Sequence, residues 1–166
     1  MRKSVSVLVV LLLFAGVARA DFNDGVVALM MGKHDDALKT FVPLAESQNH
    51  AYAQYFLGRM YANGQGVGKD AKRAAEWYRK AAEQGVADAQ YRLGLLYEAG
   101  EGVPPDLEYA YGWYGVAAHL GNAKGNEAFG RTREKLSSSE LVEAEKLVRE
   151  FVQKYGEVAE STARQQ

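Results

Sequence analysis

The hydrophobic pattern of this chain repeats itself between residues 51 and 122. Segment 51–86 is followed without a gap by segment 87–122, and 17 of the 36 aligned positions are identical. The identical positions run through both copies in this order: Ala-x-Ala-Gln-Tyr-x-Leu-Gly-x-x-Tyr, then Gly-x-Gly-Val-x-x-Asp, then Ala-x-x-Trp-Tyr-x-x-Ala-Ala, then Gly. A period of this length predicts a stack of helical repeats.

The first half of each copy has the spacing of an amphipathic helix. In the first copy, Ala53, Leu57 and Tyr61 recur every four residues, which places them on one helical face. Gly58 lies on the same face, and because it has no side chain it allows a neighbouring helix to come close. Glycine lowers helix propensity, so we expect packing to compensate for it.

The second half of each copy predicts a turn and a second helix. The glycines of 64–68 favour turns with positive φ, and Asp70 is suited to cap the helix that follows. Gly85 ends this helix. Its broad apolar stripe consists of Ala74, Trp77, Tyr78, Ala81 and Ala82. Each copy is therefore a helical hairpin, whose large aromatic side chains need another hairpin to be buried.

These residues resemble the Sel-one-like repeat family, a relative of the tetratricopeptide repeat. The resemblance implies an all-α fold, a right-handed α-solenoid of 36-residue repeats, and a role as a protein-interaction scaffold without enzymatic activity or cofactor. The matching positions of the two copies are Leu57-Gly58, Gly64, Gly66-Val67, Asp70, Ala74, Trp77-Tyr78, Ala81-Ala82 and Gly85, with Leu93-Gly94, Gly100, Gly102-Val103, Asp106, Ala110, Trp113-Tyr114, Ala117-Ala118 and Gly121.

The first twenty residues have the pattern of a secretory signal peptide. Basic Arg2 and Lys3 precede an apolar run over 5–15, and Ala18-Arg19-Ala20 forms a small-residue cleavage site. The run is shorter than the roughly 20 residues of a membrane span. We therefore expect a protein secreted across the inner membrane, which begins at Asp21, keeps no membrane span, and is periplasmic if the organism has an outer membrane.

Composition adds two constraints to this picture. After removal of the signal peptide, 17 basic residues remain against 21 acidic ones, a net charge of −4, so a nucleic-acid partner is not expected. The chain contains no cysteine, so an exported form would depend on packing for its stability and not on disulfides.

The flanks of the two copies have weaker versions of the same pattern within the repeat domain predicted for 21–156. Residues 21–50 predict a shortened hairpin, with Asp35 or Asp36 as the cap of its second helix. Pro43 either bends this helix or lies in its first turn, and one extra residue precedes Ala51. Residues 123–156 predict a partial repeat and a C-terminal capping helix that starts at Ser137 and closes the stack. The tail, 157–166, is expected to be disordered.

Catalytic and metal-binding patterns are weak in this chain. His34, His50 and His119 lack the helical spacing of a zinc site, and the glycine-rich turns lack the Lys-Ser/Thr of a phosphate-binding loop. The acidic pairs Asp35-Asp36 and Glu98-Glu101 are interpreted as solvated charge. We interpret the repeated Trp and Tyr positions as core and not as stacking platforms for sugars or bases.

The positions at which the copies differ form a second stripe on the first helices. This stripe is apolar and aromatic at its start and basic toward its end, which suits a peptide with an apolar anchor and acidic residues. Its residues also fit ordinary solvated surface, and the sequence leaves both interpretations open. The candidate partner-binding residues are Tyr52, Phe56, Arg59, Asp88, Arg92, Leu95, Lys124, Arg131 and Lys135; Asn63, Ala99 and Ala128 complete the stripe.

Three functions follow from these patterns. The leading one is an exported, non-enzymatic scaffold or adaptor that binds another protein, in an envelope assembly or its regulation, with self-association through the open ends of the stack as a further expectation. The alternatives are an enzyme that hydrolyses or binds β-lactams, as in cysteine-rich relatives of the family, and a binder of cell-wall glycans. This chain lacks the cysteine pairs and Ser-x-x-Lys of the enzyme alternative, and exposed Trp77 and Trp113 would favour the glycan binder.

Overall fold

The computed structural model describes residues 21–156 and Val158, and it is helical throughout this range, without a strand. The predicted signal peptide, 1–20, lies outside the described residues, as does the predicted tail apart from Val158. No helix in the described part is both long and apolar enough to cross a membrane. The elements are α1 (Phe22–Met30), α2 (His34–Ser47), α3 (Ala51–Asn63), α4 (Ala71–Glu83), α5 (Ala87–Ala99), α6 (Leu107–His119), α7 (Ala123–Arg133), α8 (Ser138–Phe151) and a short π-helix, η1 (Val152–Gly156).

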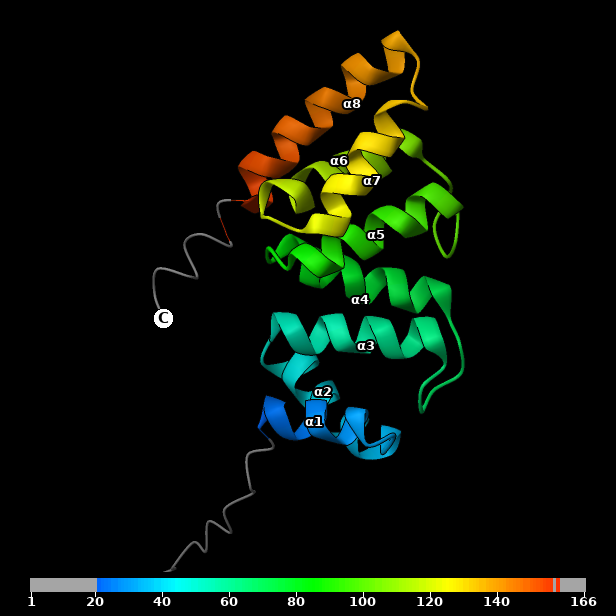
Figure 1. Cartoon of the computed structure of the whole chain (residues 1–166). Helices are drawn as coiled ribbons and strands as arrows, with labels where there is room; N and C mark the ends of the chain where they lie inside the picture. The colour runs from blue at the N-terminus through cyan, green and yellow to red at the C-terminus, as the bar shows by residue number, and fades with distance from the viewer. Residues whose placement is uncertain (1–20, 157, 159–166) are drawn as a thin grey trace, which may run out of the picture.

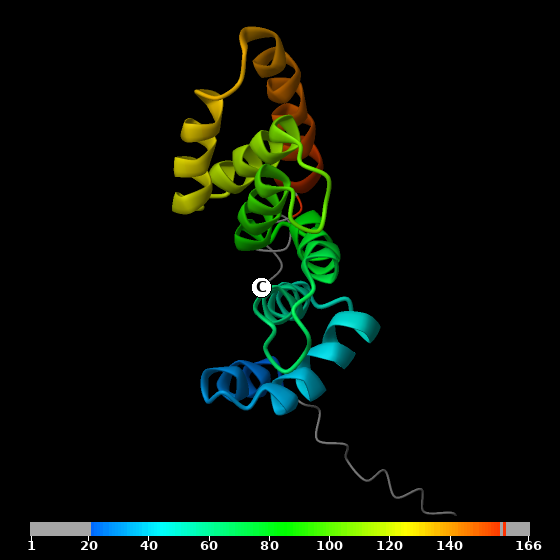
Figure 2. The same cartoon turned by 90° about the vertical axis from the view of Figure 1, so that its right-hand side faces the viewer.

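The helices form hairpins that stack into an elongated solenoid, with α1 and α2 at one end and α8 at the other (Figure 1). Each helix packs against the next one along the chain from α1 to α7, and α8 packs against α6. Seen from the side, α1 and α7 lie toward one edge of the stack, whereas α2 and α8 lie toward the other (Figure 2). The helical repeat fold predicted from the 36-residue period is confirmed.

The turns inside the two repeats have the predicted chemistry. Gly64 ends α3 and Gly100 ends α5, both in the left-handed conformation, with φ of 68° and 69°. Asp70 and Asp106 then cap α4 and α6, and each carboxylate accepts a hydrogen bond from a backbone amide in the first turn, at 3.0 and 2.9 Å. Glycine tolerates positive φ without strain, and aspartate satisfies an otherwise unpaired helical amide, so the local sequence alone produces these hairpins.

Within each hairpin, the repeated glycine of the first helix lies against the repeated tyrosine of the second. A Cβ atom added to Gly58 would lie 2.5 Å from Cδ1 of Tyr78, and one added to Gly94 would lie 2.5 Å from Cε1 of Tyr114. Both distances are far below the normal contact of about 3.5–4.0 Å between carbons. The predicted close approach at Gly58 is therefore confirmed, and the same contact recurs in the second repeat.

The junctions between hairpins are tied by the repeated glutamine. Buried Gln54 donates to the carbonyl oxygen of Ala45 at 3.2 Å, nine residues earlier, and buried Gln90 donates to that of Ala82 at 3.1 Å, eight residues earlier. The two bonds are equivalent, so the first junction contains one residue more, as the sequence predicted. Asn49, with a φ of 51°, lies in this junction and accepts a hydrogen bond from Gln54.

The predicted cap of α2 was wrong. Asp35 and Asp36 lie inside the first turn of the helix, and the residue at the capping position is Lys33, whose side chain makes no capping hydrogen bond. Carboxylates in the first turn still stabilise the positive end of the helix dipole. Pro43, whose place was undecided, lies inside α2.

The C-terminal helix begins where the sequence predicted. The Ser137 side chain accepts a hydrogen bond from the backbone amide of Glu140, and the Glu140 carboxylate accepts one from the amide of Ser137, which completes a capping box. α8 then buries Ala144 and Phe151, and Tyr155 is buried in η1.

α8 packs against α6 because two glycines leave room for it. A Cβ atom at Gly112 would lie 3.0 Å from the ring of Phe151, and one at Gly115 would lie 2.8 Å from Cγ2 of Val148. At the equivalent positions of α4, 36 residues earlier, the chain has Glu76 and Arg79, which are exposed. Among the described elements, α4 packs extensively only against α3 and α5.

This difference explains why one of the two repeated tryptophans is less buried than predicted. Trp113 is 3% exposed, with ring centroids 4.6 Å from Phe151 and 5.2 Å from Tyr155. Trp77 is only partly buried, and the Nζ of Lys80 lies 4.2 Å from the centre of its ring. The prediction of a buried core position was therefore correct for Trp113, whereas for Trp77 it was correct only in part, because none of the described helices covers α4 as α8 covers α6.

Candidate functional site

A pocket of about 350 Å³ lies between the first helices of the two repeats, α3 and α5, and the second helix of the first repeat forms part of its wall. Glu101 lies at its edge. Three predicted partner-binding residues line the pocket: Arg59, Arg92 and Leu95. Two further members of the stripe, Asn63 and Ala99, and Tyr78 of α4 line it as well.

The two arginines of this pocket are held by aromatic rings and not by carboxylates. The guanidinium of Arg59 lies 5.3 Å from the ring centre of Phe56, and that of Arg92 lies 5.8 Å from the ring centre of Tyr91. Cation–π contacts of this kind orient the group without neutralising its charge. In the part of the chain that the structure describes, neither arginine forms an ion pair, and Glu101 pairs with neither.

Tyr78 contributes a hydroxyl group to the pocket wall. The residue is 3% exposed, and its burial raises the pKa of the Tyr78 phenol to about 12, although the charges of Arg92 and Arg59 act in the opposite direction. The hydroxyl therefore stays protonated at neutral pH and is able to donate a hydrogen bond. No described residue accepts one from it.

The corresponding groove between α5 and α7 is closed by an internal carboxylate. Glu98 accepts a hydrogen bond from the Tyr114 hydroxyl at 2.7 Å, and it forms ion pairs with Lys135 at 2.6 Å and Arg131 at 3.6 Å. Burial acts to raise the pKa of Glu98, but the hydrogen bonds from Lys135 and Tyr114 outweigh it and hold this pKa below its ordinary value. Burial and the bond to Glu98 raise the pKa of Tyr114.

This cluster corrects the interpretation of Glu98 made from the sequence. Glu98 was taken as solvated charge, but its side chain is only 18% exposed and it has three partners. Arg131 and Lys135, which were predicted to belong to the binding stripe, pair with Glu98 but keep about half of their side chains exposed, so their role in binding stays a prediction. The interpretation of Glu98 was wrong because its ion pairs join residues 33 and 37 positions apart, and only the packing of α5 against α7 brings them together.

The remaining candidate residues lie apart from the pocket. Phe56 packs beneath α1, with its ring stacked 5.2 Å from that of Phe41, so it belongs to the core of the first hairpins. Asp88 accepts a hydrogen bond from Asn122 at 2.8 Å. Tyr52, which is 53% exposed, and Lys124 lie on the surface at the starts of α3 and α7.

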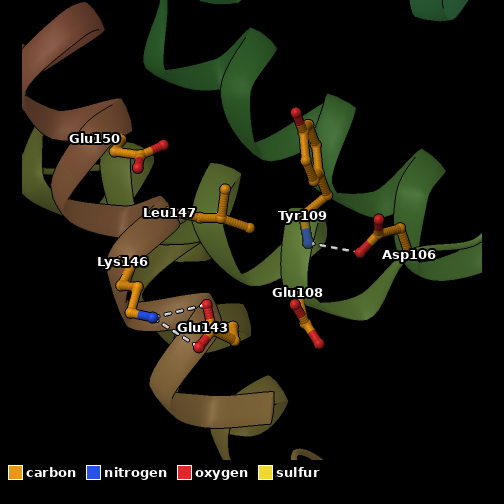
Figure 3. A pocket seen from close by; sticks show the side chains of 7 residues that line it. All are labelled: Asp106, Glu108, Tyr109, Glu143, Lys146, Leu147 and Glu150. Atoms are coloured by element: carbon orange, nitrogen blue, oxygen red, sulfur yellow. Dashed lines mark hydrogen bonds and ion pairs between the residues drawn. The ribbon is translucent and has the colours of Figure 1, made fainter.

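A second pocket, between α6 and α8, is lined mostly by charged side chains, three of which already have structural roles (Figure 3). Asp106 caps α6 by accepting from the amide of Tyr109, and Lys146 is paired with Glu143 at 2.7 and 2.9 Å. Glu143 and Lys146 belong to the same turn of α8. The other residues that line this pocket are Glu108, Leu147 and Glu150.

The histidines take no part in either pocket. His50 caps α3, since its Nδ1 accepts from the amide of Ala53 at 3.2 Å, and its ring stacks on Phe22 at 4.8 Å. Among the described residues, no three histidine or acidic side chains are placed to hold a metal ion together.

Comparison with known proteins agrees with this geometry. The family model of the Sel1 repeat matches residues 51–86 and 87–122. A comparison with curated protein sequences finds no significant match. One similar crystal structure is a protective antigen present in uropathogenic Escherichia coli strains and displaying an SLR fold, with a TM-score of 0.78 and 35% identity over 86% of this chain.

Another similar crystal structure is a Sel1 repeat protein from Oxalobacter formigenes, with a TM-score of 0.65 and 32% identity over 79% of this chain. The chain spans 31% of the length of the Escherichia coli antigen and 56% of that of the Oxalobacter protein. The fold of such repeats generally mediates interaction between proteins. The chain therefore contains two Sel1 repeats and has the helical repeat fold of the Sel1-like repeat proteins.

Proposed function

We propose that this chain is an exported, non-enzymatic scaffold that binds a segment of another protein along its first helices, in an envelope assembly or its regulation. The observation that carries this proposal is the pocket between α3 and α5, where, within the described residues, Arg59 and Arg92 form no ion pair and the Tyr78 hydroxyl forms no hydrogen bond. Two unneutralised cations beside a hydroxyl donor are complementary to an acidic group, so this concentration favours an external ligand.

Two further observations support an interaction role. Tyr52 offers an exposed aromatic ring on α3, the same helix that carries Arg59, and exposed aromatic and arginine side chains are enriched at protein interfaces. The groups that line the pocket between α6 and α8 include ones already occupied by caps and local ion pairs, which gives no support to a catalytic function. Export is inferred from the pattern of residues 1–20.

The experiment is affinity capture from the envelope fraction of the organism with residues 21–166 as bait. The variant carries Arg59→Glu and Arg92→Glu. The control carries Lys72→Glu and Arg149→Glu, which change the net charge equally on the exposed surfaces of α4 and α8. We expect the native chain and the control to retain a partner protein. The variant with Arg59→Glu and Arg92→Glu, the groove variant, should lose it.

Two results would overturn the proposal. One is that the native chain retains no protein. The other is that the groove variant, still helical by circular dichroism, captures the same proteins as the control, since this would place the interaction outside the pocket.

A further inference from the structure

The pocket between α3 and α5 (the first groove) and the cluster around Glu98 between α5 and α7 (the second groove) are each built on a repeated tyrosine, but their acceptors and cations differ. Tyr78 and Tyr114 are 36 residues apart, and each ring lies against the glycine of its own hairpin at the same distance. In the second groove, Glu98 accepts the hydrogen bond of the tyrosine hydroxyl. The residue 36 positions before Glu98 is Ala62, which lines the first groove. The first groove thus has the donor but no carboxylate at the position of Glu98; Glu101 lines it, but accepts no hydrogen bond from Tyr78.

The first groove also has the positive charge that a carboxylate would need. In the second groove, Arg131 and Lys135 of α7 neutralise Glu98. In the first, the cations are Arg59 of α3 and Arg92 of α5, both of which lie near enough to Tyr78 for their charges to act on its phenol. The cations therefore come from different positions in the two grooves, but in both they lie near the repeated tyrosine.

We propose that the pocket between α3 and α5 binds a glutamate or aspartate side chain of the partner segment, in the place that Glu98 occupies in the neighbouring groove. This inference rests on the proposed function and specifies the chemistry of the partner. Glu98 shows that the arrangement holds a side-chain carboxylate through one tyrosine hydrogen bond and two cations. Such charge-assisted hydrogen bonds are among the strongest in proteins.

A defined probe tests the pocket without knowledge of the partner. Fluorescent hexaglutamate with blocked ends is titrated with residues 21–166 at low ionic strength, where charges are least screened, and anisotropy reports binding. Hexaglutamine with blocked ends is the neutral control, and hexaglutamine with a free C-terminus presents only a terminal carboxylate. We expect binding of hexaglutamate alone. Equal affinity for either glutamine peptide would overturn the inference of a side-chain carboxylate.

Two tyrosine variants assign the binding to one groove. Tyr78→Phe removes the free hydroxyl and keeps the ring, and we expect it to weaken hexaglutamate binding about tenfold or more, the typical effect of a hydrogen bond to a charged group. Tyr114→Phe is the matched control, because its hydroxyl is already bound to Glu98, and we expect it to leave the affinity unchanged. Equal effects of the two variants would contradict the proposal.

An alanine variant tests the same inference from the opposite direction. Ala62→Glu places a carboxylate where the second groove has Glu98, so it should occupy the pocket and abolish hexaglutamate binding. Ala62→Gln adds the same bulk without the charge, and we expect it to weaken binding much less. If Ala62→Glu binds the probe as the native chain does, the pocket is not the carboxylate site.

The two proposals fail in different ways. If affinity capture depends on Arg59 and Arg92 but Ala62→Glu still captures the partner, the scaffold function stands and the carboxylate inference falls. If hexaglutamate binds as expected but no envelope protein is retained, the pocket chemistry stands and the scaffold function falls.

Discussion

The contact between the repeated glycine and the repeated tyrosine is open to a quantitative test through Gly94→Ala. The added Cβ atom would lie 2.5 Å from Cε1 and 2.7 Å from Cδ1 of Tyr114, well inside normal contact distance. The ring has little freedom to move, because Tyr114 is fully buried and its hydroxyl donates to Glu98 at 2.7 Å. Overpacking of this kind costs about 1–3 kcal/mol.

Alanine also favours the helix over glycine by about 0.5–1 kcal/mol, so the net expectation is a loss of about 0–2.5 kcal/mol in the free energy of unfolding. Gly130→Ala in α7 is the control, because no atom outside its own local backbone lies within 4 Å of its added Cβ. We expect this variant to raise the free energy of unfolding by about 0.5–1 kcal/mol, the difference in helix propensity between alanine and glycine.

The assay is urea unfolding of residues 21–166, followed by far-ultraviolet circular dichroism. The two glycine variants should move the midpoint in opposite directions with an unchanged slope. Gly58→Ala repeats the test in the first hairpin, where the added Cβ also lies 2.5 Å from a tyrosine ring. If Gly94→Ala stabilises the protein as much as Gly130→Ala, the argument that glycine is needed for this close packing is refuted.

Three further predictions concern the cap, the buried carboxylate and the tryptophans. Ser137→Ala should lower the free energy of unfolding by about 0.5–2 kcal/mol through loss of the α8 cap, and Ser138→Ala, in the first turn, should not; equal effects in urea unfolding would contradict this. The pKa of Glu98 is lowered in the folded state, so its stabilisation is present above its ordinary pKa and is lost as the pH falls through the lowered value. Glu98→Gln should therefore lose more stability at neutral than at strongly acidic pH, and a pH-independent difference would count against the carboxylate. Acrylamide should quench the fluorescence of the Trp113→Phe variant, which retains the partly exposed Trp77, more than that of Trp77→Phe; equal quenching would contradict the assigned burial.

The sequence predicted which residues share the stripe, but not which of their charges are paired. The spacing of differing positions correctly placed Arg59, Arg92 and Leu95 on neighbouring helices facing one pocket, because helical periodicity decides which residues share a face. It could not show that Arg131 and Lys135 pair with a carboxylate on another helix. The sequence does show that Ala62 and Glu98 occupy equivalent positions of the two copies. Only the structure shows that this position lies beside a tyrosine in each copy.

The sequence by itself determined the helices, their turns and the order in which they stack. These features follow from local rules, namely the apolar period, glycine at positive φ and a capping side chain, which the two copies repeat with the same residues. Only the tertiary structure decided which surfaces are covered and which charges remain free. Those properties depend on contacts between helices distant in sequence, such as α8 against the glycines of α6 and Glu98 against the residues of and after α7. A repeat pattern leaves such contacts undetermined, because each copy packs against different neighbours.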